Sequence, residues 1–258
     1  MLQQTPVVRV LPAWERWMRR WPTPADLAAE PVAEAIRMWD RLGYPRRALR
    51  LHATAAVIVE RHAGLVPAPH AELLALPGVG SYTAAAVASF AFGGRHAVLD
   101  TNVRRVQARV VTGAPYPARS LTAAEVALGE RLVPADPARV ARWAVAAMEL
   151  GALVCTARRP RCANCPLAAM CRWRLDGSPD NEDGPRRGQA YAGTDRQVRG
   201  LLLGALRSAE APLLHAALAA AAPDRVLRDP GQRERALDGL VADGLVEPLA
   251  GGRYGLPT

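Results

Sequence analysis

The sequence contains no lysine: all 33 of its basic residues are arginine, against 24 Asp and Glu, for a formal net charge of +9. A coding bias toward Arg, Ala, Gly and Pro is the simplest explanation. The absence still excludes every mechanism in which a lysine amine forms a Schiff base. The surplus of positive charge favours a polyanionic partner.

Long apolar runs are also missing, and none approaches the length of a membrane span. The first residues, MLQQTPVVRV, lack the basic end and apolar stretch of a secretory signal. We therefore expect a cytoplasmic protein with no membrane contact.

Cysteine is scarce, but its placement is informative. All four cysteines fall within seventeen residues, at Cys155, Cys162, Cys165 and Cys171. Disulfides are rare in the cytoplasm. The clustering instead favours four thiolates on one metal centre, either a four-iron four-sulfur cluster or a single tetrahedral zinc ion.

Apolar residues recur at helical spacing along most of the chain, which predicts an all-α fold. Helices are expected at residues 7–18, 33–42, 46–61, 71–76, 82–92, 121–132 and 137–153. A polar stretch rich in Gly, Pro and Asp, residues 174–193, is typical of a flexible linker.

The last part of the chain, residues 194–258, is predicted to be a small separate unit. Helices are expected at 195–207, 211–221 and 232–243, followed by two short apolar runs around Gly251 and Gly252. Three helices and a hairpin indicate a winged helix. Such a unit binds either DNA or another protein surface, and the sequence leaves both open.

A glycine-containing turn, LPGVG, joins two of the predicted helices. Gly78 and Gly80 can take backbone angles closed to other residues, and exposed amides at a helix start bind phosphate. Leu76, Gly78, Val79 and Gly80 are therefore candidate DNA-binding residues. Asp100 follows at the start of another helix, where it would cap the first turn, a role compatible with catalysis.

Several motifs together resemble those of one enzyme superfamily. LPGVGSYTA, VLDTNV and the Cys-x6-Cys-x2-Cys-x5-Cys loop occur together in helix-hairpin-helix DNA glycosylases of the endonuclease III type. MLQQTPV, RLGYPRRALRLH and MELGALVCT narrow the resemblance to the MutY-like adenine DNA glycosylases. The resemblance covers residues 1–173 and implies two helical lobes, 1–112 with the hairpin and 113–173 with the cysteines.

This resemblance implies a cofactor, a substrate and a partner. The cofactor would be a four-iron four-sulfur cluster, with zinc as the minor alternative. The substrate would be double-stranded DNA in which adenine is mispaired with 8-oxoguanine or guanine, bound by a monomer. Many members read 8-oxoguanine with a Nudix-like domain, for which the last 65 residues, 194–258, are too short.

The resemblance also implies the catalytic residues. Loss of adenine leaves positive charge on the sugar, which the Asp100 carboxylate would stabilise. The amide dipoles of a helix N-terminus favour its charged form. Tyr82 stands where relatives that also cut the backbone carry lysine, so we expect base removal only. Tyr82 and Asn102 are expected beside Asp100.

Other residues match DNA-contacting positions of the family. Gln3, Gln4 and Tyr44 correspond to residues that line the lesion site or wedge into the duplex, a role suited to flat or amide side chains. Arg104 and Arg105 follow Asp100 and are expected to meet phosphate or solvent.

Two other functions remain open. A thymine-mismatch glycosylase also carries a tyrosine after the hairpin and a later aspartate, although LQQT argues against it. A non-catalytic DNA-binding or lesion-binding protein would use the same hairpin, cluster and winged helix.

The family's catalytic glutamate, a general acid, would stand two residues upstream of Met1. The 258-residue chain is therefore expected to release adenine roughly 100- to 10,000-fold more slowly than a form extended upstream to Glu-Val. The extended form should also melt at a higher temperature. Equal single-turnover rates and melting temperatures for the two forms would contradict this expectation.

Overall fold

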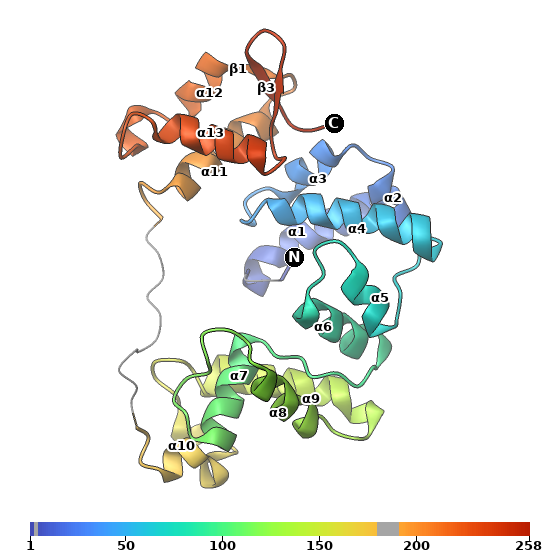
Figure 1. The fold of residues 1–258 in the computed structure, drawn as a ribbon, viewed down its shortest axis with the longest axis vertical. Coiled ribbons are helices and arrows are strands. Elements are labelled where there is room, and N and C mark those ends of the chain that lie inside the picture. The colour runs from blue at the N-terminus through green and yellow to red at the C-terminus, as the bar shows by residue number, and fades with distance from the viewer. Residues whose placement is uncertain (3–4, 180–190) are drawn as a thin grey trace. The chain divides into compact units, whose positions relative to one another are not determined.

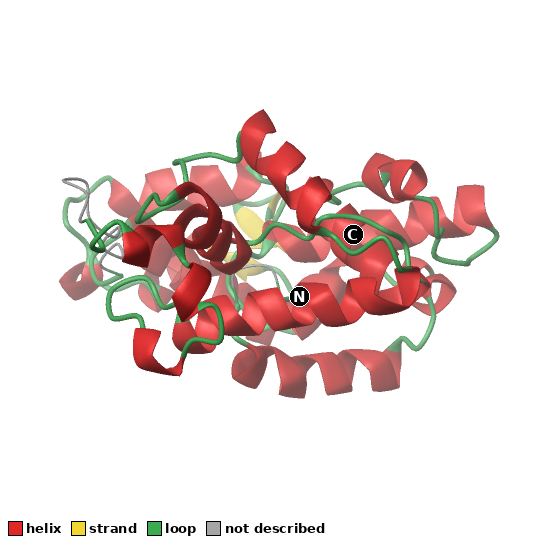
Figure 2. Ribbon diagram, turned by 90° about the horizontal axis from the view of Figure 1, so that it is seen from below, coloured by secondary structure: helices red, strands yellow, loops and turns green. Residues whose placement is uncertain are grey.

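The computed structural model describes residues 1–2, 5–179 and 191–258. Nearly all of their regular structure is helical, as Figure 1 and Figure 2 show, which confirms the predicted all-α fold. Gln3, Gln4 and most of the predicted linker lie outside the described residues. No helix in the described part is both long and apolar enough to cross a bilayer.

The chain divides into two compact units. The first unit comprises Met1–Val66, Leu76–Gly78 and Gln189–Thr258, and the second comprises Pro67–Ala75 and Val79–Gly188. These boundaries differ from those of the predicted domains. The helices of the hairpin group with the cysteine loop, and the C-terminal residues group with the N-terminal helices.

The first unit begins with four helices. They are α1 (Val7–Arg20), α2 (Pro24–Ala28), α3 (Val32–Trp39) and α4 (Arg46–His62). Three tryptophans pack edge to face in their core: Trp17 lies 4.7 Å from Trp21 and 6.0 Å from Trp39, between ring centroids. Such pairs bury large apolar areas and fix the helix crossings.

The C-terminal part of this unit has the topology of a winged helix. Its elements are α11 (Asp195–Ser208), β1 (Leu213–Leu214), α12 (His215–Ala221), η5 (Asp224–Val226), α13 (Gln232–Ala242), β2 (Glu247–Leu249) and β3 (Arg253–Gly255). The strands form an antiparallel sheet in the order β1-β3-β2.

One predicted helix of this part was wrong at its start. Residues 211–221 have helical spacing, but the helix begins only at His215. Leu213 and Leu214 instead pair with Tyr254 and Arg253 of β3. Proline at 212 disfavours helical geometry for its predecessor, and pairing with a strand forty residues away then decides the conformation.

The second unit contains the hairpin and the cysteine loop. Its elements are α5 (His70–Ala75), α6 (Ser81–Phe92), α7 (Thr101–Gln107), η1 (Ala108–Thr112), α8 (Ala123–Leu132), α9 (Pro137–Glu149), η2 (Leu150–Val154), η3 (Cys162–Asn164), η4 (Ala168–Met170) and α10 (Arg172–Leu175). Local signals set many of their ends. Gly93, with φ 69°, ends α6, and Asp136 caps α9 ahead of a proline at its first position.

Two helices of this unit end in a wider, π-helical turn. The predicted helix at 137–153 is α-helical only to Glu149 and continues as η2, while α7 continues as η1. At the end of η2 the amide of Cys155 donates to the carbonyl of Leu150 at 2.7 Å. π-Turns of this kind often mark functional sites. Here the π-turn η2 directly precedes Cys155, the first cysteine of the loop.

Candidate functional site

The turn between α5 and α6 uses its two glycines differently. Gly78 has φ 73°, and a Cβ there would lie 2.7 Å from Cβ of Arg50, so only glycine fits. Gly80 has an ordinary extended backbone, contrary to the expectation of an unusual angle, and a Cβ there would meet nothing within 4 Å. Leu76 is buried, with 5% of its surface exposed, whereas Val79 is half-buried.

The start of α6 carries no side-chain cap. Gly80 occupies the N-cap position and has no side chain to accept from the first-turn amides. The amides at a helix start, together with the helix dipole, attract phosphate. This geometry is consistent with the proposed phosphate grip of the hairpin.

Asp100 is the N-cap of α7, and both of its carboxylate oxygens accept hydrogen bonds. Oδ1 accepts from the amide of Val103 at 2.7 Å, and Oδ2 accepts from Nδ2 of Asn102 at 2.9 Å. Two donors fix the orientation of the carboxylate, which remains half-exposed. Asn102 therefore lies beside Asp100.

A chain of hydrogen bonds continues from Asn102 to the cysteine loop. Oδ1 of Asn102 accepts from Arg105 at 2.8 Å, and the same guanidinium donates to the carbonyls of Gly151 at 2.6 Å and Cys155 at 2.7 Å. Arg105 is 6% exposed. Burial lowers its pKa, although the nearby Cys155 thiol opposes that effect. Arg105 therefore meets neither phosphate nor solvent, contrary to expectation.

Close backbone approach supports this chain. A Cβ on Gly151 would lie 2.7 Å from both Cβ and the carbonyl oxygen of Asn102. Any side chain at residue 151 would therefore push η2 away from α7. The glycine allows the two helices to touch at the residue that orients Asp100.

Tyr82, in the first turn of α6, is half-buried. Its ring packs against a small apolar cluster that includes Ala85, Val98 and Ala144. Burial raises the pKa of Tyr82, and the charge of Asp100 raises it further, so the phenol stays neutral at physiological pH. No hydrogen bond joins Tyr82 to Asp100 in the described part of the chain.

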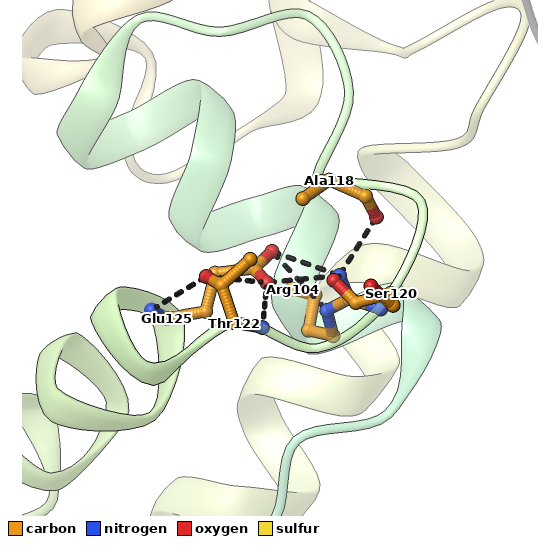
Figure 3. Close-up of polar contacts among 5 residues, drawn as sticks. All are labelled: Arg104, Ala118, Ser120, Thr122 and Glu125. Atoms are coloured by element: carbon orange, nitrogen blue, oxygen red, sulfur yellow. Dashed lines mark hydrogen bonds and ion pairs between the residues drawn. The ribbon is translucent and has the colours of Figure 1, made fainter.

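Arg104 also departs from its expected role. Its guanidinium binds both carboxylate oxygens of Glu125, at 3.0 and 2.9 Å, and the carbonyls of Ala118 and Ser120, each at 2.8 Å (Figure 3). Glu125 closes a capping box with Thr122 at the start of α8. The pair ties α7 to α8 and to the loop that precedes α8.

Tyr44 lies in a tightly fastened loop between α3 and α4, residues 40–45, named here the Tyr44 loop. Its ring is 52% exposed. Tyr44 has φ 49° and Asp40 has φ 47°, values that cost a non-glycine residue about 1–2 kcal/mol each. Such strain persists only where the surroundings enforce it.

All four cysteines line a single pocket in the second unit, together with the ring of Trp173. Arg109, only 2% exposed, lines the same pocket and donates to Sγ of Cys155 at 3.4 Å and to the carbonyls of Thr156 and Ala157 at 2.8 and 2.9 Å. A buried permanent cation beside four thiols suits a centre that carries net negative charge when the thiols are ionised.

The four cysteines that line the pocket are the donor set of a four-iron four-sulfur cluster. Among the described residues no group of three or more His, Cys, Asp and Glu side chains is placed to hold a metal ion. In a four-iron cluster each thiolate binds a different iron, so the sulfurs stand farther apart than around one ion. The pocket brings together the four thiols that such a cluster needs.

Sequence reasoning missed three contributors to this site. Arg105, Arg109 and Gly151 carry the contacts of α7 and η1 with η2 and the cysteine loop, and of these only Gly151 lies in one of the motifs, MELGALVCT. The spacing of Gly151, directly before the run that ends in Cys155, was the only available signal.

Two protein-family models match the chain. The HhH-GPD superfamily base excision DNA repair protein model matches residues 1–127, and the model of the iron-sulfur binding domain of endonuclease III matches residues 155–171. The second match begins at Cys155 and ends at Cys171.

Known proteins resemble the chain over most of its length. It is 51% identical to the adenine DNA glycosylase of Mycobacterium tuberculosis (strain ATCC 25618 / H37Rv), over 100% of this chain and 83% of the relative. A thermostable thymine-DNA glycosylase is similar in structure, with a TM-score of 0.62 and 29% identity, over 68% of this chain and 80% of that one. A non-covalent endonuclease III–DNA complex is also similar in structure. Its TM-score is 0.59 and its sequence identity 26%, over 69% of this chain and 81% of that one.

Replacing Glu125 with Gln should destabilise the protein by roughly 2 kcal/mol at neutral pH. Burial would raise the pKa of Glu125, but the hydrogen bonds from Arg104 and Thr122 outweigh it and hold that pKa below its usual value. The contribution is therefore complete above the ordinary pKa of glutamate and is lost as pH falls through the lowered value. Urea unfolding of both forms at several pH values measures it. Glu60→Gln, at an exposed site, is the control. A stability difference that does not shrink in acid would contradict this account.

Proposed function

The chain belongs to the adenine DNA glycosylases of the helix-hairpin-helix base excision repair superfamily, and from this premise we propose that its substrate is double-stranded DNA carrying adenine mispaired with 8-oxoguanine or guanine. The cofactor is a four-iron four-sulfur cluster, bound through the Cys155–Cys171 loop. The observation that carries the proposed site is the fixed, half-exposed carboxylate of Asp100.

Asp100 stabilises the positive charge that develops on the deoxyribose as adenine leaves. Stabilisation of this kind is strongest when the charged group is already oriented, because no reorganisation is then needed during the reaction. The amide of Val103 and the side chain of Asn102 supply that orientation. Asn102 is thus a positioning residue, and Arg105 holds it in place.

Tyr82 has a different role from the lysine that cleaving relatives carry at its position. A Schiff base requires an amine, and the phenol of Tyr82 has none. With no lysine in the sequence, the chain removes the base and leaves the strand intact. The ring packs against Ala85, Val98 and Ala144.

The hairpin and the Tyr44 loop supply the DNA contacts. The uncapped start of α6, with Gly78, Val79 and Gly80 before it, binds a backbone phosphate, and buried Leu76 anchors the turn. The exposed ring of Tyr44 wedges into the duplex beside the flipped adenine, with Gln3 and Gln4 at the lesion. The protein acts as a monomer in the cytoplasm.

The cluster site has two roles in this chain, one electrostatic and one structural. Cys155, Cys162, Cys165 and Cys171 would hold the cluster, which would cross-link the segments that carry them. Arg109 balances its negative charge, and Arg105 links the carbonyl of the first cysteine to Asn102. The chain's own residues therefore connect the integrity of the loop to the orientation of Asp100.

Asp100→Asn removes the charge at nearly constant volume. Single-turnover release of adenine opposite 8-oxoguanine should fall roughly 100- to 1,000-fold, while affinity for the duplex is retained. Asp136→Asn changes the same group at another helix N-cap and is the matched control.

The same assay tests the rest of the proposed activity. Duplexes with adenine or thymine at the mismatch separate the two glycosylase specificities, and omission of heat and alkali reports strand cleavage. Rapid base release by Asp100→Asn, preference for thymine, or direct nicking would each refute part of the proposal.

Gly151→Ala should lower the rate of base release because the new methyl group displaces Asn102 and, through it, Asp100. Affinity for undamaged duplex and iron content should change little. Gly204→Ala, where a Cβ meets nothing within 4 Å, serves as the control substitution in a helix. Normal kinetics in Gly151→Ala would show that the close approach does not matter for Asp100.

A further inference from the structure

The winged-helix region, residues 194–258, lacks the charge expected of a DNA reader. Its eight arginines are matched by eight Asp and Glu residues, so the net charge of +9 resides entirely in residues 1–193. DNA-binding modules owe most of their affinity to a surplus of basic side chains. The winged-helix region has no such surplus.

Two arginines of this region are also paired with carboxylates within it. Arg233 pairs with Asp224 and Arg235 with Asp229, each at 2.7 Å. The exposed positions of α13, the third helix, carry both signs of charge, with Glu234 and Asp238 beside Arg235. This surface does not match a phosphate backbone.

The winged-helix region instead shares a hydrophobic core with the N-terminal helices. Val198, Leu202 and Leu206 of α11 belong to the same buried cluster as Ile36 and Trp39 of α3. These five residues are each no more than 2% exposed. The region is therefore packed on α3 as part of one folded unit.

Arginine contacts lock this packing beside the Tyr44 loop. Nη1 of Arg37, on α3, donates to the carbonyls of Leu206, Arg207 and Ala209 at 3.3, 2.7 and 2.9 Å, which satisfies the C-terminal end of α11. In return, Arg207 donates to the carbonyl of Asp40 at 2.6 Å. Asp40 is the first residue of the Tyr44 loop.

The other end of the loop is held as well. Arg46, directly after the loop, forms an ion pair with Asp243 at 3.2 Å, and Asp243 is itself held by Arg199 of α11. The winged-helix region therefore contacts both the first residue of the loop and the residue that follows its last.

Between these two points the backbone carbonyls of the loop accept hydrogen bonds. Arg9 binds the carbonyl of Arg41, Thr5 that of Leu42, and Trp39 that of Gly43. The carbonyl of Tyr44 accepts from the amide of Arg47. Five consecutive carbonyls, from Asp40 to Tyr44, thus have donors, and the first of these donors comes from the winged-helix region.

We propose that the winged-helix region is a positioning device for the Tyr44 loop and does not read DNA. Its Arg207 and Asp243 hold the two ends of the loop, so that the strained backbone presents Tyr44 in one orientation. The proposal rests on the proposed function only in taking Tyr44 as the residue that wedges into the duplex.

The test uses the full chain and a duplex that carries the fluorescent base 2-aminopurine next to the adenine mispair. The fluorescence of 2-aminopurine rises when this base is unstacked from its neighbours. Arg207→Met keeps the apolar stem but removes the donors. It should reduce the fluorescence rise several-fold while affinity for plain duplex stays unchanged. Arg207→Lys, which keeps a donor, should restore most of the signal. Arg253→Met, an arginine of the wing with its one described hydrogen bond to Ala250, is the matched control and should behave like the unaltered protein.

Asp243→Asn tests the other end of the loop and serves if Arg207→Met does not fold. It should also lower the fluorescence rise, although the loss of a negative charge does not itself weaken binding to DNA. Thermal melting of each variant separates loss of folding from loss of positioning.

Tyr44→Ala distinguishes the two hypotheses. If it leaves the fluorescence rise intact, the wedge role of Tyr44 fails. If Tyr44→Ala abolishes the fluorescence rise while Arg207→Met and Asp243→Asn, both folded, leave it intact, the positioning role is overturned.

Weaker and less salt-dependent binding of plain duplex by Arg253→Met would overturn the claim that the winged-helix region does not read DNA. A Tyr44→Ala, Arg207→Met double variant that matches Tyr44→Ala alone is the result expected if Arg207 acts through Tyr44.

Discussion

The guanidinium of Arg105 joins three parts of the second unit that the site cannot do without. It binds the side chain that orients Asp100, the backbone of η2, and the carbonyl of the first cysteine. A buried cation is tolerated only when its donors are satisfied, so these contacts must form together. The narrow approach at Gly151 and the π-turn before Cys155 both follow from this requirement, since each brings a carbonyl within reach of Arg105.

Local patterns were sufficient for the residues whose geometry is local. Asp100 was recognised as a helix cap, Gly78 as a turn residue, and the cysteines as one centre from their spacing. Arg105 and Arg109 were not recognised. In a chain whose basic residues are all arginine, type alone does not separate a buried guanidinium from a surface one. What separates them is pairing with carbonyls 46 to 50 residues away, which no local pattern encodes.

The C-terminal region shows the same limit at the level of packing. Helical periodicity located α11 and α13 well, because each buries one apolar face. Periodicity predicts that one face of a helix is buried, but it does not identify the segment that buries it. For α11 that segment is α3, more than 150 residues earlier in the chain. The short strand β1 was missed for a related reason, since its conformation depends on β3 and not on its own sequence.

The two π-turns make the length of their segments as important as their composition. An α-helix advances by about 100° per residue, and a π-turn holds one residue more than the α-helical turn it replaces. Loss of a single residue within Leu150–Val154 would let α9 continue as an ordinary helix, and the wide-turn hydrogen bond from the amide of Cys155 to the carbonyl of Leu150 could not form. The segment is therefore constrained in its length as well as by the need for glycine at residue 151.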